Sequence, residues 1–121
     1  MHEMTIAWAL LEQLDALAQA NALARIDSVH VQAGELRGLV PEAMQLAFRE
    51  AARGGPAAEA TLELEILTPL ARCRRCGREF RPAPNSYRCA GCGEADVDMI
   101  VGDEIVLRSV TGETRTEEDA R

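Results

Sequence analysis

The sequence predicts an α+β fold, in which two helices cover one face of a three-stranded mixed sheet and a small cysteine-rich module is inserted late in the chain. Two observations predict this. Apolar residues recur at helical spacing in two segments and at alternate positions in three others, in the order helix, strand, helix, strand, strand. All four cysteines fall between the last two strands. Two layers are the economical way for two helices to cover the apolar face of such a sheet.

Length, hydrophobic content and net charge limit the classes of protein to which the chain can belong. The chain has 121 residues, of which 47% are hydrophobic, enough for one compact domain with a small insert. No apolar run reaches the ~20 residues of a membrane helix, and the N-terminus lacks the features of a secretory signal. We therefore expect a cytoplasmic protein with reduced thiols and no membrane partner. The net charge of −7 argues against nucleic acid as the main partner.

The first helix is predicted over residues 4–24, where no proline interrupts the pattern. Its apolar positions are Ile6, Ala7, Leu10, Leu11, Leu14, Leu17 and Ala18. Asn21 is a residue type that can end a helix. We expect Trp8 to lie in the core or at its edge; the alternative is an exposed tryptophan that contacts a partner.

Residues 26–33 alternate as a strand, with Val29 and Val31 facing inward and His30 on the polar face, where we expect a solvated surface histidine. A second helix is predicted over residues 41–53. Pro41 suits the first position of that helix, and its apolar stripe consists of Met44, Ala47, Phe48 and Ala51.

Two further strands are predicted over residues 61–67 and 103–110. Their inward residues are Leu62, Leu64, Ile66, Ile105 and Leu107. The strand–helix–strand crossover should leave the first two strands parallel, and the third should return antiparallel to the second. We expect one domain from residues 1–70 plus 99–110, a cysteine module at 71–98 and a disordered tail at 111–121.

The cysteines form two Cys-x-x-Cys pairs, and a glycine, Gly77 or Gly93, follows each pair. The four thiols are Cys73, Cys76, Cys89 and Cys92. Four thiolates can close a tetrahedron around Zn²⁺, and glycine allows the positive φ that a tight turn needs. The favoured interpretation is a structural four-cysteine, zinc-ribbon-like domain. A thioredoxin-like redox motif and two disulfides are the alternatives.

The loop between the pairs can hold two short strands, at residues 79–81 and 86–88. Six arginines crowd the segment 72–88, with only Glu79 opposing them, so that this segment has a net charge of +5. The arginines are Arg72, Arg74, Arg75, Arg78, Arg81 and Arg88. They either screen the negative charge of a zinc–thiolate site or form a basic surface for an acidic partner.

The chain begins Met1-His2-Glu3. The α-amine of Met1, the backbone nitrogen of His2 and its imidazole Nδ1 can reach one metal ion through five- and six-membered chelate rings. An amide or carboxylate of Glu3 could supply a fourth donor. Nitrogen-rich tetragonal donor sets suit Ni(II) or Cu(II).

Several motifs together resemble one family, the HypA/HybF hydrogenase-maturation metallochaperones, over about residues 1–110. The motifs are Met1-His2-Glu3, the segments 26–36 and 60–66, Pro41-Glu42 with Ala47-Phe48, the paired Cys-x-x-Cys and residues 102–105. The combination of the N-terminal triplet with the late cysteine pairs is the specific part of the resemblance.

The resemblance implies a nickel carrier rather than an enzyme. It implies Ni(II) as transient cargo at His2, with Met1 and Glu3 as neighbouring donors, and structural Zn(II) held by the four cysteines. It also implies delivery to a nickel–iron hydrogenase large-subunit precursor, with a maturation GTPase as a further partner. The alternatives are a zinc-ribbon module that binds nucleic acid or protein, and a thiol oxidoreductase. The acidic net charge and the 3% aromatic content count against nucleic-acid binding.

Overall fold

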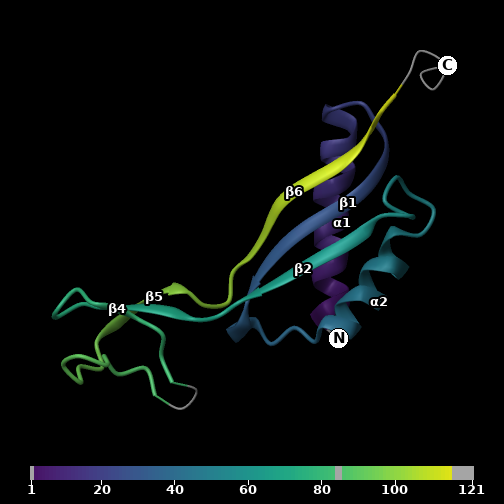
Figure 1. The fold of residues 1–121 in the computed structure, drawn as a ribbon. Coiled ribbons are helices and arrows are strands. Elements are labelled where there is room, and N and C mark those ends of the chain that lie inside the picture. The colour runs from purple at the N-terminus through teal and green to yellow at the C-terminus, as the bar shows by residue number, and fades with distance from the viewer. Residues whose placement is uncertain (1, 84–85, 116–121) are drawn as a thin grey trace. The chain divides into compact units, whose positions relative to one another are not determined.

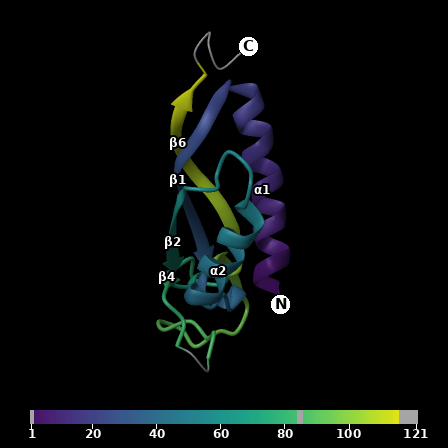
Figure 2. The same ribbon diagram turned by 90° about the vertical axis from the view of Figure 1, so that its right-hand side faces the viewer.

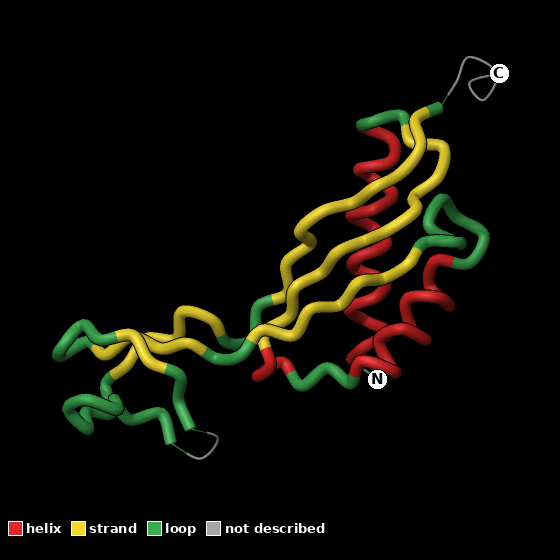
Figure 3. The backbone as a smooth tube through the Cα atoms, viewed as in Figure 1, coloured by secondary structure: helices red, strands yellow, loops and turns green. Residues whose placement is uncertain are grey.

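The computed structural model describes residues 2–83 and 86–115, and over these the chain forms two α-helices, a 3₁₀ turn and six strands (Figures 1 and 3). The elements are α1 (His2–Ala20), β1 (Leu23–Gly34), η1 (Glu35–Arg37), α2 (Pro41–Ala52), β2 (Thr61–Leu67), β3 (Leu70–Cys73), β4 (Glu79–Phe80), β5 (Val97–Val101) and β6 (Ile105–Thr114). The chain divides into two compact units. The first comprises residues 1–31, 39–65 and 106–121, and the second comprises 32–38 and 66–105.

The first sheet confirms the predicted fold class. Its strand order is β2-β1-β6, and both helices lie on one face of it (Figure 2). β1 and β2 run in the same direction and β6 runs in the opposite one, so the sheet is mixed (Figures 1 and 2). Each helix therefore buries its apolar stripe against strands, as the two-layer prediction requires.

The third strand of this sheet has a different neighbour from the expected one. The backbone N–H of Gly34 donates to the carbonyl of Glu104 at 2.8 Å, and the N–H of Arg115 donates to Ala22 at 2.6 Å. These bonds place β6 antiparallel beside β1. The expected direction of the third strand, antiparallel to the second, is therefore confirmed, but its hydrogen-bonded neighbour is β1 and not β2. β1 thereby gains partners on both edges, which its buried backbone groups require because no water reaches them.

The core lies between the helices and β1. Its buried side chains are Ala7, Leu10, Leu11, Leu14 and Ala18 on α1, Met44, Ala47, Phe48 and Ala52 on α2, Ile26, Val29, Val31 and Ala33 on β1, and Leu62 on β2. α1 ends earlier than predicted, where the backbone and side-chain nitrogens of Asn21 both donate to the carbonyl of Leu17. Ala22, with φ of 52°, then turns the chain into β1. Asn21 thus ends the helix as its residue type suggested.

Three apolar side chains are more exposed than predicted. Trp8 is 64% exposed, and Leu17 and Ile66 are just over one-third exposed. Trp8 is four residues before Glu12 and seven before Asp15, so helical geometry places it with these acidic residues on the solvent face. The prediction that Trp8 belongs to the core is therefore wrong. The exposure that the alternative required is confirmed, and the contact with a partner stays a prediction.

The second sheet surrounds the cysteines, with strand order β4-β3-β5 and antiparallel pairing of β3 with each neighbour. Ala71 pairs with Phe80, and Cys73 pairs with Val97. The predicted strand at residues 79–81 corresponds to β4. β3 and β5 lie on either side of the cysteines and were not predicted from the sequence. The strand expected at 86–88 is absent from the described structure, where Ser86 forms an isolated bridge with Ala83.

β6 continues to Thr114, so the predicted disordered tail is wrong for residues 111–114. Polar contacts with β1 hold this extension: the hydroxyls of Ser28 and Thr111 lie 2.5 Å apart, and Arg25 binds Glu113 at 2.9 Å. Residues 116–121 of the expected tail lie outside the described residues. Of the helices described, none combines the length and the apolar character needed to cross a membrane.

Gly34 provides a test of the packing in the second unit. A Cβ atom on Gly34 would overlap the carbonyl oxygen of Gly102, and both contacting atoms belong to the backbone. Gly34→Ala should lower the free energy of unfolding by about 1–3 kcal/mol, measured by urea denaturation. Gly55→Ala is the control, because the nearest atom to its added Cβ is 3.6 Å away. Equal stability of the two variants would contradict the close approach.

Candidate metal sites

The four cysteine sulfurs converge within the second unit. Cys73 ends β3, Cys76 follows in the adjoining turn, and Cys89 and Cys92 occupy a second turn before β5. Their sulfur atoms all lie within 4.8 Å of one another. Gly77 and Gly93 have φ of 77° and 76°, and their N–H groups donate to the carbonyls of Cys73 and Cys89, both at 2.9 Å. The predicted glycine-dependent turns are therefore confirmed.

The geometry of the sulfurs fits a tetrahedral zinc ion. The Cys73–Cys92 and Cys76–Cys89 sulfur pairs are each 3.6 Å apart. A tetrahedron with Zn–S bonds of about 2.3 Å has edges of about 3.8 Å. Disulfide sulfurs would be about 2.05 Å apart, so the four thiols are free. The quartet is suited to a structural ion, because all four positions of the tetrahedron come from protein.

Backbone N–H groups point at the sulfurs and shift their ionisation. The backbone of Cys92 and that of Gly91, whose nitrogen lies 3.3 Å from the sulfur, lower the pKa of Cys89 to about 6. For Cys92, the backbone N–H of Glu94 lowers the pKa, but burial and the neighbouring thiols outweigh it and raise the pKa to about 11. The thiolate of Cys89 therefore forms readily, whereas the thiol of Cys92 holds its proton until a cation compensates the charge.

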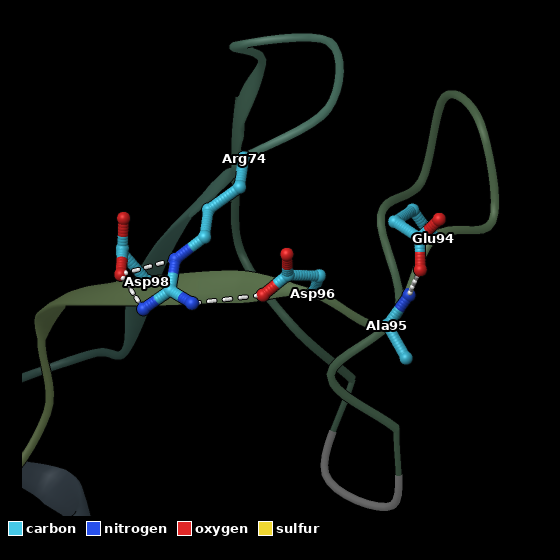
Figure 4. Close-up of polar contacts among 5 residues, drawn as sticks. All are labelled: Arg74, Glu94, Ala95, Asp96 and Asp98. Carbon is cyan, nitrogen blue, oxygen red and sulfur yellow. Dashed lines mark hydrogen bonds and ion pairs between the residues drawn. The ribbon is translucent and has the colours of Figure 1, made fainter.

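Acidic side chains offset much of the arginine cluster. Arg74 binds Asp96 at 2.9 Å and Asp98 at 2.5 Å, whereas Glu94 accepts a bond from the N–H of Ala95 (Figure 4). Glu94 also lies 3.7 Å from Arg75. The side-chain bond from Arg74 lowers the pKa of Asp98. These three acidic residues lie after residue 88, so the net charge of +5 given for the segment 72–88 does not include them.

Two other arginines of the cluster are bound to backbone carbonyls. Arg81 donates to Thr68 and Pro69, and Arg88 donates to Gly93. The guanidinium of Arg72 binds Glu79, the one acidic residue within the segment 72–88, at 2.6 Å. Because Arg72, Arg74 and Arg75 each lie beside an acidic residue of the same unit, the structure argues against a basic surface for an acidic partner at these positions.

The N-terminal residues are the second candidate site that the sequence indicated. Met1 lies outside the described residues, and α1 begins at His2, whose side chain is 54% exposed. The side chain of Glu3 is buried, and its Oε2 accepts a hydrogen bond from the backbone N–H of Val40 at 3.1 Å. The same oxygen lies 3.5 Å from His2 Nε2. The bond from Val40 is the main reason that the pKa of Glu3 lies below its ordinary value.

The partner of Glu3 could not be found from sequence patterns. Val40 contributes only its backbone N–H, from the position just before α2, and any residue except proline carries that group. The other histidine lies elsewhere: His30 is on the polar face of β1, with Nε2 2.9 Å from Glu65 on β2. Within residues 2–83 and 86–115, the cysteine quartet is the one group of three or more His, Cys, Asp or Glu side chains close enough to share a metal ion.

The chain is similar to known proteins over most of its length. The family model described as "Hydrogenase/urease nickel incorporation, metallochaperone, hypA" matches residues 1–112. The hydrogenase maturation factor HypA of Chlorobium luteolum is 34% identical over 110 residues, covering 91% of this chain and 94% of the relative. That of Streptomyces avermitilis is 38% identical over 112 residues, covering 91% and 86%.

Solved structures share the fold. The solution structure of the Ni metallochaperone HypA from Helicobacter pylori aligns with a TM-score of 0.71 at 22% identity, covering 93% of this chain and 98% of that one. A second solution structure of a HypA protein aligns with a TM-score of 0.69 at 23% identity, covering 95% and 98%.

Loss of one sulfur should abolish metal binding by the quartet. Cys73→Ala leaves three ligands, and we expect zinc loss and greater amide hydrogen exchange over residues 66–105. Arg75→Ala is the matched control, since it removes a neighbouring side chain that is 72% exposed and keeps all four sulfurs. α1 and α2 should keep their protection in both variants. Full zinc content in Cys73→Ala, measured by elemental analysis, would contradict this assignment.

The ionised form of Glu3 should stabilise the first unit. Because its pKa is lowered in the folded state, its contribution is present above the pKa of the unfolded chain and is lost as the pH falls through the lower folded value. Urea midpoints of Glu3→Gln should lie below wild type at neutral pH and converge with it in acid. Glu12→Gln, at an exposed position of the same helix, should match wild type throughout. A pH-independent deficit in Glu3→Gln would contradict the role of the charge.

Proposed function

Because this chain belongs to the HypA family of nickel metallochaperones for hydrogenase maturation, we propose that it binds Ni(II) through its first residues and delivers the ion to a nickel–iron hydrogenase large-subunit precursor. The observation that carries the proposal is the exposed imidazole of His2 at the first turn of α1. The first four N–H groups of an α-helix have no intrahelical acceptor. The backbone nitrogens beside His2 are therefore not committed to the helix.

The proposed nickel donors are nitrogen atoms. They are the α-amine of Met1, the backbone nitrogen and imidazole of His2, and the backbone nitrogen of Glu3. The hydrogen bond from Val40 to the Glu3 carboxylate favours the amide of Glu3 over its side chain as the fourth donor, because that carboxylate is already bound. Such a nitrogen set suits the tetragonal geometry of Ni(II).

The four cysteines are proposed to hold structural Zn(II), which would give the second unit part of its folding free energy. Thiolate sulfur and N-terminal nitrogen differ in donor type, so the resident ion and the cargo need not compete for one site. We propose a carrier that has no catalytic role and that works with a maturation GTPase as well as the precursor. The ion-paired arginines and the net charge of −7 count against the alternative of a nucleic-acid-binding zinc ribbon.

The decisive test concerns residue 2. His2→Ala removes the imidazole, and one extra residue before Met1 converts its amine into an amide. Both changes should abolish the N-terminal nickel site in titrations of zinc-loaded protein read by visible absorption. Wild-type binding should also weaken between about pH 7.5 and about pH 6, because protons compete with the metal for the amine and the imidazole.

The matched control is His30→Ala, which removes the other histidine, held by Glu65 on the sheet. It should bind nickel as wild type does. Zinc content should stay the same in all variants. If His2→Ala bound nickel as tightly as wild type, or if the extended form kept the same spectrum, the proposal would fail.

A further inference from the structure

Arg78 differs from the other five arginines of the segment 72–88. With the residues that the structure describes, its side chain forms no hydrogen bond and no ion pair. The other five each have a carboxylate or carbonyl partner: Arg72, Arg74, Arg75, Arg81 and Arg88. The backbone of Arg78 is nevertheless fixed beside the first cysteine turn, because its carbonyl accepts the N–H of Cys73 at 2.9 Å. The positive charge of Arg78 is therefore the one in this cluster that no described protein oxygen binds.

The side chain of Arg78 lies against the second cysteine turn. A Cβ atom on Gly91, between Cys89 and Cys92, would lie 2.9 Å from Nη1 and 3.2 Å from Cδ of Arg78. The same Cβ atom would lie 3.7 Å from Sγ of Cys89. The guanidinium and this sulfur therefore border the same small space, which is open because residue 91 has no side chain.

The charges around this space are complementary. Four thiolates around a Zn²⁺ ion carry a formal net charge of −2. The Cys89 sulfur already accepts the backbone N–H of Gly91 at 3.3 Å and lies 3.6 Å from the sulfur of Cys76. A nearby cation lowers the energy of such an anionic group, and groups outside the ligand shell commonly adjust how firmly a metal is held.

Building on the proposed zinc site, we propose that Arg78 supplies the counter-charge of the metal–thiolate group, acting on it across the open space at Gly91. The positive charge makes the thiolates poorer nucleophiles and lowers the energy of the metal-bound form. Arg78 thereby slows both the release of zinc and the attack of electrophiles on the sulfurs. The glycine at position 91 serves this arrangement, because a larger residue would displace the guanidinium.

The test uses zinc-loaded full-length protein and two uncharged probes, a neutral chelator and N-ethylmaleimide, whose approach does not depend on the charge of the protein. Arg78→Met keeps much of the apolar stem and removes the charge. It should raise the rates of zinc transfer and of thiol modification about threefold to tenfold. Arg78→Lys keeps a positive charge on a stem of similar length and should retain rates close to wild type.

Arg75→Met is the matched control, because it removes the same charge from a side chain that is 72% exposed and lies beside Glu94. Its rates should stay within about twofold of wild type, since exposed ion pairs contribute little. In cobalt-substituted protein, the thiolate-to-cobalt charge-transfer band should move to longer wavelength in Arg78→Met and not in Arg75→Met. The reason is that loss of a nearby cation raises the energy of the sulfur lone pairs.

Gly91→Ala tests the position of the charge. It keeps all four sulfurs and every charge, and the atom that its Cβ displaces is the end of a flexible side chain. The rates should rise in the wild-type background and should not rise further in the Arg78→Met background. Equal increases in both backgrounds would show that the alanine disturbs the cysteine turn itself, and would contradict displacement of Arg78.

The results distinguish this proposal from the proposed zinc site. Wild-type rates and an unshifted cobalt band in Arg78→Met would overturn the role of Arg78 and leave the zinc site in place. Equal acceleration in Arg78→Met and Arg75→Met would assign the effect to net charge and contradict a specific position beside Cys89. Purified wild type that takes up no zinc would overturn the zinc site, and the role of Arg78 with it.

Discussion

The convergence of four sulfurs is the constraint on which the second unit depends. The buried cluster of this unit is small: it contains Ala71, Cys73, Phe80 and Cys89, with Val97 packed against it. Two of these four buried residues are themselves cysteines. Apolar burial on this scale is weak compared with the entropy of ordering the loops around it, so a bound ion is the strongest available source of folding free energy. The ion pairs of Arg74 connect the first cysteine turn with Asp96, which directly precedes β5, and with Asp98 in β5.

The first unit obtains its stability differently. Two amphipathic helices cover a sheet whose central strand buries alternate side chains, and this core requires no metal. Its one described buried carboxylate, Glu3, uses the N–H of Val40 and so fixes the start of α1 beside the start of α2. The arrangement leaves the imidazole of His2 at the surface. A rigid helix start with an exposed donor suits exchangeable metal binding, because the ligands are positioned but not enclosed.

Much of this structure could be predicted from local patterns. Alternation located β2 at its observed bounds, Pro41 marked the start of α2, and the glycine after each Cys-x-x-Cys pair predicted left-handed turns that the structure contains. The errors arose where a pattern is weak or where non-local pairing decides. β3 is too short to show a period, and the polar end of β6 is ordered by Ser28 and Arg25, far away in the chain. Trp8 differs from the prediction because its angular position on the helix, shared with Glu12 and Asp15, decides its exposure and its large apolar side chain does not.

Each of the two units is built from segments that are not continuous in the sequence, and this limits how the units can be separated. Residues 32–38 belong with 66–105, and the N–H groups of Gly34 and Leu36 bind the carbonyls of Glu104 and Gly102. No single continuous fragment therefore contains the cysteine unit alone: a peptide that spans only 66–105 lacks the segment that hydrogen-bonds to its own C-terminal end. Domains that are joined by a single linker can be exchanged between proteins. The segments of these two units alternate along the chain, so one unit cannot be cut out as a single continuous fragment without breaking the other.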